Sequence, residues 1–187
     1  IQSATDSFYR WDSIPRSIPS WNRNLTLKES FQVSCVPAYQ LLAGAIGYER
    51  MKKWISSIDY GDKDISSGVD DFWLPREGKK SIKISPLEQA QLIRKLVNGE
   101  LTFNQQSKSI LREIMVIETT TEGVFYGKTG SGVNQDSNVE QSLGWFVGYV
   151  TSKDQNYSFA CLIKGINVSG KDSKGIIESI LKKSGLL

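Results

Sequence analysis

Four short runs of β-branched and aromatic residues follow one another in the second half of this 187-residue chain, and turn-forming residues separate them. The runs begin at Met115, Gly123, Ser142 and Tyr157. Each has the length and composition of a β-strand. Strands that follow one another directly pair antiparallel, because a parallel pair needs a long crossover connection. The pattern therefore predicts a four-stranded antiparallel sheet.

Helical patterns precede the predicted sheet, and one more follows it. Thr26 and Glu29 have the spacing of a capping box at a helix start. Ser34 can cap the next helix, and Pro37 suits its first turn. In the closing helix, one predicted apolar face consists of Ile176, Ile177, Ile180 and Leu181. The helices are predicted over about 27–31, 35–46, 48–59, 86–97, 104–114 and 172–187.

This order of elements predicts an α+β fold in which helices pack on an antiparallel sheet. A chain of this length suits one domain over residues 1–187, with a helical lobe at about 26–114 and the sheet with its closing helix at about 115–187. Residues 1–25 have an irregular pattern. Residues 63–85 form a long predicted loop whose apolar side chains suggest that it is packed.

The composition excludes several classes of function. The net charge is +3 with no basic block, so a nucleic-acid partner is not expected. Apolar runs stay shorter than the roughly 18 residues that a membrane span needs. The chain has no histidine, which removes His-based catalysis and the commonest metal ligand, and we expect no metal. A catalyst of this composition must use Lys, Ser, Tyr, Asp or Glu.

The stretch FYGKTGSGV contains the strongest local signal in the chain. Lys128 supplies a cation, Thr129 a hydroxyl, and Gly130 allows a ligand to lie along the strand edge. Backbone N–H groups after Gly130 can face an oxyanion. The alternative is a solvated lysine at the end of a strand. The functional interpretation is a site for a peptide that carries a carboxylate, or for a mimic of one.

Three further positions have both a structural and a functional interpretation. Ser34 in Ser34-Cys35-Val36 is either a helix cap or a hydroxyl that relays protons near Lys128. Tyr60-Gly61-Asp62 is either a turn that ends a helix or part of a site. Trp73 is either a core residue or a side chain of the same cleft.

Taken in order, these motifs resemble those of the class D (oxacillinase-type) serine β-lactamases. The resemblance runs from about Trp11 to Leu187, and its most specific parts are PSWNRNLTLKESFQVSCVPAYQLLA and GKTGSG with GWFVGYV. The motifs that carry it are Ser-x-Val at 34–36, Tyr-Gly-Asp at 60–62, Phe-Trp-Leu at 72–74, Lys-Thr-Gly at 128–130 and Gly-Trp-Phe-Val-Gly at 144–148.

The resemblance implies a two-lobed β-lactamase/transpeptidase-like fold, with the active site between the lobes. It implies a serine acyl-enzyme that water hydrolyses, with a β-lactam antibiotic as the substrate. Ser34 would relay protons, and Val36 would shield the base. Lys128 and Thr129 would meet the substrate carboxylate beside Gly130. The N–H of Ser131 would form half of the oxyanion hole, and Trp73 would hydrogen-bond a carbamylated lysine, formed with CO₂, that acts as general base.

The sequence departs from the family in three places. Asp62 stands where the family has asparagine. Lys171 and Lys174 are the basic residues near the last helix, where the family often has an arginine. The one Ser-x-x-Lys run, which starts at Ser179, lies on the closing helix and in the wrong order. We therefore expect the nucleophile and the carbamylated lysine to lie outside this chain, and the domain to be incomplete at its N-terminus.

The same motifs fit other functions. A β-lactam-sensing receptor domain and a penicillin-binding transpeptidase share the fold, and a fragment could lack catalysis. Val36 favours the hydrolase, because sensors tend to have a polar residue there and transpeptidases usually have Ser-x-Asn. The resemblance also implies a periplasmic or secreted protein, and a homodimer is possible.

Overall fold

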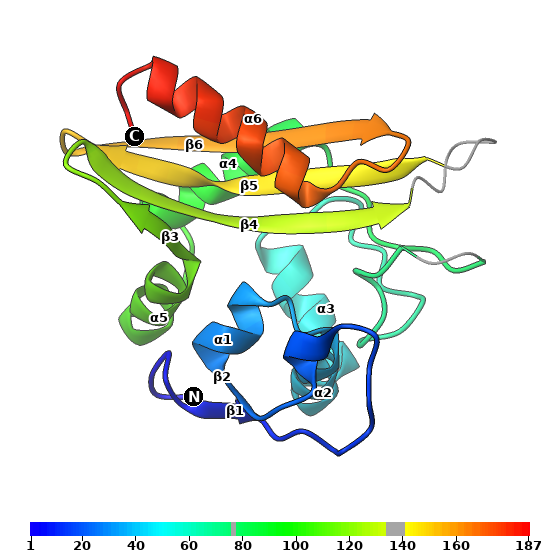
Figure 1. The fold of residues 1–187 in the computed structure, drawn as a ribbon. Coiled ribbons are helices and arrows are strands. Elements are labelled where there is room, and N and C mark those ends of the chain that lie inside the picture. The colour runs from blue at the N-terminus through cyan, green and yellow to red at the C-terminus, as the bar shows by residue number, and fades with distance from the viewer. Residues whose placement is uncertain (76–77, 134–140) are drawn as a thin grey trace.

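The four predicted strands form one antiparallel sheet in the order β3-β4-β5-β6. The structure is a computed structural model and describes residues 1–75, 78–133 and 141–187. The sheet and the helices around it confirm the α+β class (Figure 1). The strands are β3 (Val116–Thr119), β4 (Gly123–Val133), β5 (Ser142–Ser152) and β6 (Gln155–Gly165).

Helix α6 (Gly170–Lys183) lies on one face of the sheet, while the remaining helices lie on the other side (Figure 1). Ile177 and Leu181 of α6 are buried against Phe125, Phe146 and Val150 of the sheet. The predicted apolar face of α6 was too wide, because Ile176 and Ile180 remain 44% and 52% exposed. A single helix on a sheet buries a narrow stripe, and these two side chains lie outside it.

Capping residues set the starts of helices on the other side of the sheet. The Thr26–Glu29 capping box precedes α1 as predicted, and Ser85 with Glu88 forms a second one before α4. The described helices here match the predicted ranges to within about two residues. They are α1 (Leu27–Gln32), α2 (Val36–Ile46), α3 (Tyr48–Ser57), α4 (Pro86–Val97) and α5 (Gln105–Met115).

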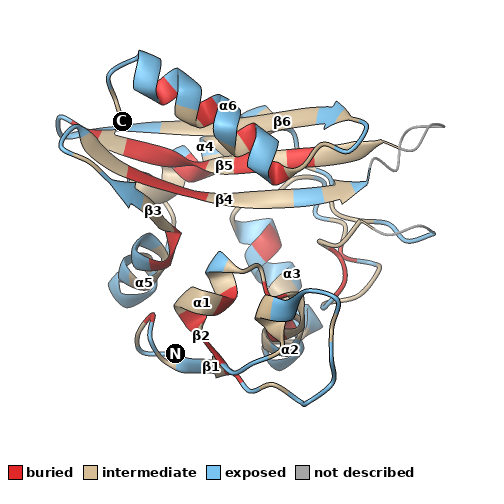
Figure 2. Ribbon diagram, viewed as in Figure 1, coloured by how far each residue is buried: buried red, intermediate tan, exposed pale blue. Residues whose placement is uncertain are grey.

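The two faces of the sheet receive alternate residues of β4. Phe125 packs toward α6, whereas Tyr126 belongs to the cluster with Ile114 and Met115 of α5. Tyr126 stacks on Tyr149 of β5, with ring centroids 4.3 Å apart. Because side chains alternate along a strand, Lys128 points to the same side as Tyr126, toward the helices. Buried residues occupy stretches of both β4 and β5 (Figure 2).

The N-terminal segment is mostly irregular, as predicted, but it contains a short antiparallel pair that the pattern did not indicate. Strand β1 (Ser7–Tyr9) pairs with β2 (Leu25–Thr26), and a 3₁₀ turn, η1 (Pro19–Trp21), lies between them. Runs of two or three residues are too short to show a two-residue alternation.

The loop after α3 is packed, although it has no helix or strand in its described residues between Ile58 and Ser85. Phe72 and Ile65 are buried with Ile55 of α3, and the Ile82 N–H donates to the Phe72 carbonyl at 2.8 Å. Trp73 is half-buried. The loop therefore has its own small core and holds Trp73 beside the sheet.

We predict that two glycines of α6 respond in opposite directions to alanine. A Cβ on Gly170 would meet the Gly130 carbonyl at 2.6 Å, whereas a Cβ on Gly175 would meet nothing within 4 Å. Gly170→Ala should lower the free energy of unfolding by about 2 kcal/mol or more through overpacking. Gly175→Ala should raise it by about 0.5–1 kcal/mol, because alanine favours the helix.

Urea denaturation of both variants checks this prediction. A Gly170→Ala variant as stable as the Gly175→Ala variant would contradict the close packing of α6 on β4.

Candidate functional site

A cavity of 390 Å³ lies between the helix-facing side of the sheet and the loop after α3. This volume is within the range of small-molecule sites, which is roughly 300–1,000 Å³. Five of the seven residues predicted for the site line it directly. These lining residues are Trp73, Lys128, Thr129, Gly130 and Ser131.

The edge of β4 is open beside this cavity. Strand β3 is short, and its register with β4 ends at the pair Val116 and Tyr126. In the described residues, no strand pairs with β4 on that side from Gly127 to Val133. An open strand edge offers backbone N–H and C=O groups to an extended ligand. The prediction that a ligand can lie along this strand therefore agrees with the geometry.

Lys128 connects the cavity to Ser34. Its ammonium donates hydrogen bonds to the Ser34 hydroxyl, to the Thr129 carbonyl at 3.0 Å and to Thr129 Oγ1 at 3.4 Å. The ammonium also lies 5.6 Å from the centroid of the Phe31 ring. Burial lowers the pKa of Lys128 because a charged group loses hydration there. The structure thus brings together Ser34 and Lys128, as the sequence predicted.

Ser34 does not cap α2, and that sequence interpretation was wrong. The N-cap of α2 is Cys35, without a side-chain capping bond. Ser34 belongs instead to the end of α1, where the Ser34 N–H donates to Phe31 O and the Cys35 N–H to Ser30 O. These two bonds form a Schellman motif with Ser34 at its C′ position. Ser34 accordingly has a left-handed φ of 52°.

Glycine is the usual residue at a C′ position with positive φ. The C′ residues of other helices in this chain can be compared with Ser34. Helices α3, α4 and α6 end with the same pair of backbone bonds. Glycine occupies the C′ position in α4 and α6, at Gly99 and Gly185, whereas α3 has Asp59 there, with a φ of 55°. Glycine is favoured there because a Cβ is strained at positive φ. In α1 the strained residue is the one whose hydroxyl contacts Lys128. Strain of this kind is commonly retained at functional positions.

Trp73 reaches the cavity from the packed loop. Its ring meets Phe72 edge to face, with centroids 5.1 Å apart, and it packs against the cluster of Ile55 and Ile65. Both sequence interpretations of Trp73 therefore apply, because it contacts a core cluster and also lines the cavity. Val36 is half-buried in the first turn of α2 and is not among the residues that line the cavity.

Asp62 forms hydrogen bonds that stabilise the packed loop. Its carboxylate accepts the N–H groups of Asp64 and Lys83, each at 3.1 Å, and its own N–H donates to the Lys83 carbonyl at 2.9 Å. These bonds join the two ends of the packed loop. Asp62 is not among the residues that line the cavity, so the change from asparagine adds no acid to that lining.

The basic residues near the cavity differ from those considered in the sequence. Lys171 is exposed, Lys174 pairs with Glu178 at 3.1 Å, and neither lines the cavity. Lys164 of β6 and Lys83 line it together with Lys128, and the described lining contains no carboxylate. The lining suits an anionic ligand. In the sequence, the only sign of Lys164 is a single cation near the end of the apolar run FACLIKG.

Among the residues that the structure describes, no group of three or more His, Cys, Asp or Glu side chains is arranged to hold a metal ion. In the same part of the chain, none of the helices combines the length and the apolar character that crossing a bilayer requires.

Comparisons with known proteins agree on one family. The model of the penicillin binding protein transpeptidase domain matches residues 2–182. Probable beta-lactamase YbxI of Bacillus subtilis is 39% identical over 178 residues, which are 95% of this chain and 62% of that protein. The chain therefore spans about three fifths of the length of this relative.

Solved structures show the same similarity. The crystal structure of a class D beta-lactamase from Bacillus subtilis has a TM-score of 0.85 at 38% identity and covers 100% of this chain and 73% of that one. The C-terminal domain of the BlaR penicillin-receptor from Bacillus licheniformis has a TM-score of 0.88 at 32% identity, over 98% of this chain and 72% of that one.

We predict that Ser34 makes the protein less stable than a glycine at this position would, because serine is strained at positive φ. Ser34→Gly should raise the free energy of unfolding by about 1 kcal/mol, because glycine adopts positive φ without a steric penalty. The matched control is Gly99→Ser, which places a serine at the equivalent position of α4, where a Cβ meets only the end of Lys108 at 3.9 Å. It should lower the free energy of unfolding by a similar amount.

Thermal and urea denaturation of the two variants measure both changes. A Ser34→Gly variant that is less stable than the parent would mean that the bond to Lys128 outweighs the backbone strain.

Proposed function

Because the chain belongs to the family of penicillin binding protein transpeptidase domains, in the group that includes class D β-lactamases and their receptor relatives, we propose that it is the substrate-binding part of a class D β-lactam hydrolase. The observation that carries the proposal is the hydrogen bond from Lys128 to Ser34 at a cavity that Trp73, Thr129 and Ser131 also line. We take residues 1–187 as one domain whose helical and sheet parts enclose this cavity.

The substrate would bind through its carboxylate. Lys128 and Thr129 would contact that group, because a partly buried cation and a neighbouring hydroxyl bind a carboxylate well. Gly130 leaves room for the ligand against the open edge of β4. The backbone N–H of Ser131 would contribute half of an oxyanion hole, where negative charge develops during acyl transfer.

Ser34 would relay protons between the reacting groups. Its oxygen accepts a hydrogen bond from the Lys128 ammonium, so its own proton can be donated to another acceptor. A leaving nitrogen of the opened ring is a suitable acceptor. Val36, two residues further on, would shield the general base from water.

The nucleophilic serine and the base would come from outside residues 1–187. The Ser-x-x-Lys run at Ser179 lies on α6, where Ser179 is exposed and absent from the cavity lining. A carbamylated lysine, formed with CO₂, would supply the general base. Trp73 is the residue of this chain that would hold it, because an indole N–H is a donor and a carbamate is an acceptor.

The other members of this family provide the second candidate function. A β-lactam-sensing receptor domain is favoured by the similarity to the BlaR penicillin-receptor domain, at a TM-score of 0.88. Val36 favours the hydrolase over the sensor and over a transpeptidase. For either candidate, we propose a periplasmic or secreted location and allow a homodimer.

Lys128→Ala in the full gene product tests the role of the cavity. Loss of a cation paired with the substrate carboxylate should lower kcat/KM for nitrocefin about 30- to 1,000-fold. This factor corresponds to a loss of about 2–4 kcal/mol of transition-state stabilisation. Lys53→Ala is the control, because Lys53 is an exposed lysine of α3 that does not line the cavity, and it should change kcat/KM less than about threefold.

Equal effects of the two lysine variants would contradict the assignment of Lys128. The same assay separates the two candidates, because a hydrolase completes many turnovers while a sensor stops after one equivalent with a lasting acyl adduct in the intact-mass spectrum.

Trp73→Phe tests the carbamylated lysine. If the indole N–H holds a carbamate, nitrocefin hydrolysis should fall, and added bicarbonate should restore part of it, because carbamylation is a reversible equilibrium with CO₂. Trp145→Phe is the matched control, since Trp145 also lines the cavity, and its activity should not respond to bicarbonate. A Trp73→Phe variant that ignores bicarbonate would remove Trp73 from this role.

A further inference from the structure

The carbonyl of Val33 has a partner far outside its own helix. The indole N–H of Trp21 donates to Val33 O at 2.9 Å. Val33 is the C-cap of α1, and the last carbonyls of a helix have no partner within it. A bond from a side chain twelve residues earlier therefore satisfies a group that the helix itself leaves open.

This bond acts directly on the conformation of Ser34. The Val33 carbonyl and the Ser34 nitrogen belong to one planar peptide unit. An anchor on the carbonyl restricts rotation of that plane, and rotation of the plane changes φ of Ser34. The φ of Ser34 is 52°, a value that serine adopts at a cost. The direction of the Ser34 hydroxyl toward Lys128 depends on this angle.

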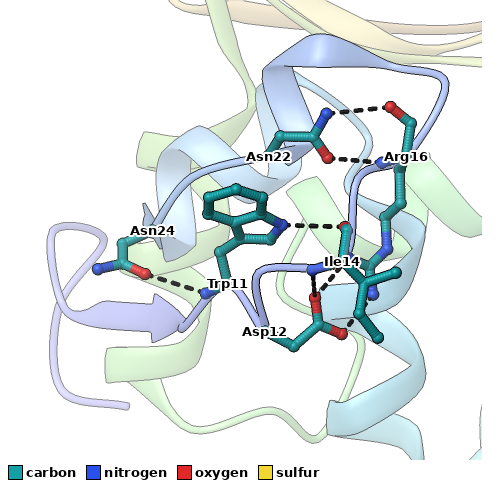
Figure 3. A network of polar contacts seen from close by, with 6 residues as sticks. All are labelled: Trp11, Asp12, Ile14, Arg16, Asn22 and Asn24. Atoms are coloured by element: carbon teal, nitrogen blue, oxygen red, sulfur yellow. Dashed lines mark hydrogen bonds and ion pairs between the residues drawn. The ribbon is translucent and has the colours of Figure 1, made fainter.

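Asn22, the residue next to Trp21, is held by polar contacts with the segment before it. Asn22 accepts the Arg16 N–H at 2.8 Å and donates to the Arg16 carbonyl at 3.0 Å (Figure 3). The Arg16 guanidinium forms a two-pronged ion pair with Asp12, with both bonds at 2.7 Å. Paired bonds of this kind fix geometry as well as adding energy. The residue next to Trp21 is thus held at both of its amide atoms.

We propose that Trp21 is a positioning residue for Ser34. Its indole N–H holds the Val33–Ser34 peptide in the left-handed turn and so keeps the Ser34 hydroxyl on the Lys128 ammonium. The effect on the turn follows from contacts within this chain. The consequence for catalysis rests on the proposed function, in which Ser34 relays protons during acylation.

Trp21→Phe removes the N–H and keeps an aromatic ring in place. Amide hydrogen exchange at Ser34 and Cys35, whose N–H groups form the turn, should become about fivefold faster, the factor expected for loss of one ordinary hydrogen bond. Trp11→Phe is the matched control. Trp11 packs against the same cluster and also donates its indole N–H to a backbone carbonyl, that of Ile14, at 3.1 Å. It should leave exchange at Ser34 and Cys35 unchanged.

Asn22→Ala provides a second test that keeps Trp21. It removes both bonds to Arg16, so it should also speed exchange at Ser34 and Cys35. Unchanged exchange at these two amides in Trp21→Phe, or in Asn22→Ala if the first variant does not fold, overturns the proposal. An equal acceleration in Trp11→Phe overturns it as well, because a general loosening of the cluster would then explain the effect.

Acylation by nitrocefin in the full gene product measures the catalytic part. Trp21→Phe should lower the acylation rate constant about tenfold with little change in the binding constant, and Trp11→Phe should change neither. Faster exchange with a normal acylation rate constant overturns the role of Trp21 in catalysis. If the parent protein forms no acyl adduct at all, the proposed function fails, while the exchange rates still decide whether Trp21 holds Ser34.

Discussion

The hydrogen bond from the Lys128 ammonium to the Ser34 hydroxyl joins residues that are 94 positions apart in the chain. One partner lies on the central part of the sheet, and the other ends the first helix. Both are held at a cost. Burial lowers the pKa of Lys128, and Ser34 has a left-handed backbone that glycine would adopt more easily. Two unfavourable features that meet at one contact indicate that this contact is retained for more than stability.

The shape of the cavity follows from the sheet around that contact. Because β3 pairs with β4 only as far as Tyr126, the rest of β4 keeps an open edge. The N-terminus of α6 closes the other side of this region, where the Gly170 N–H donates to Ser131 Oγ at 3.0 Å. The lining has three lysines and, within the described residues, no carboxylate. An anionic ligand in extended form matches both the open edge and the charge.

Sequence patterns predicted the elements well and their neighbours less well. Helices with capping residues, such as α1 and α4, and long apolar strands, such as β5, were found with nearly their observed bounds. Ser34 was misassigned because a serine before a helix suits an N-cap, and the pattern cannot tell a start from the end of the preceding helix. Lys164 was overlooked because a cation at the end of a strand is usually solvated.

The sequence by itself determined the fold class and the identity of the motifs, since hydrophobic periodicity, capping residues and the Lys-Thr-Gly run are local properties of the chain. Only the tertiary structure decided that Ser34 contacts Lys128, that Trp21 holds the Val33 carbonyl, and that Lys164 rather than Lys171 lines the cavity. The physical reason is that such contacts depend on how whole helices are placed against the sheet. Packing across the chain sets that placement, and no local pattern records it.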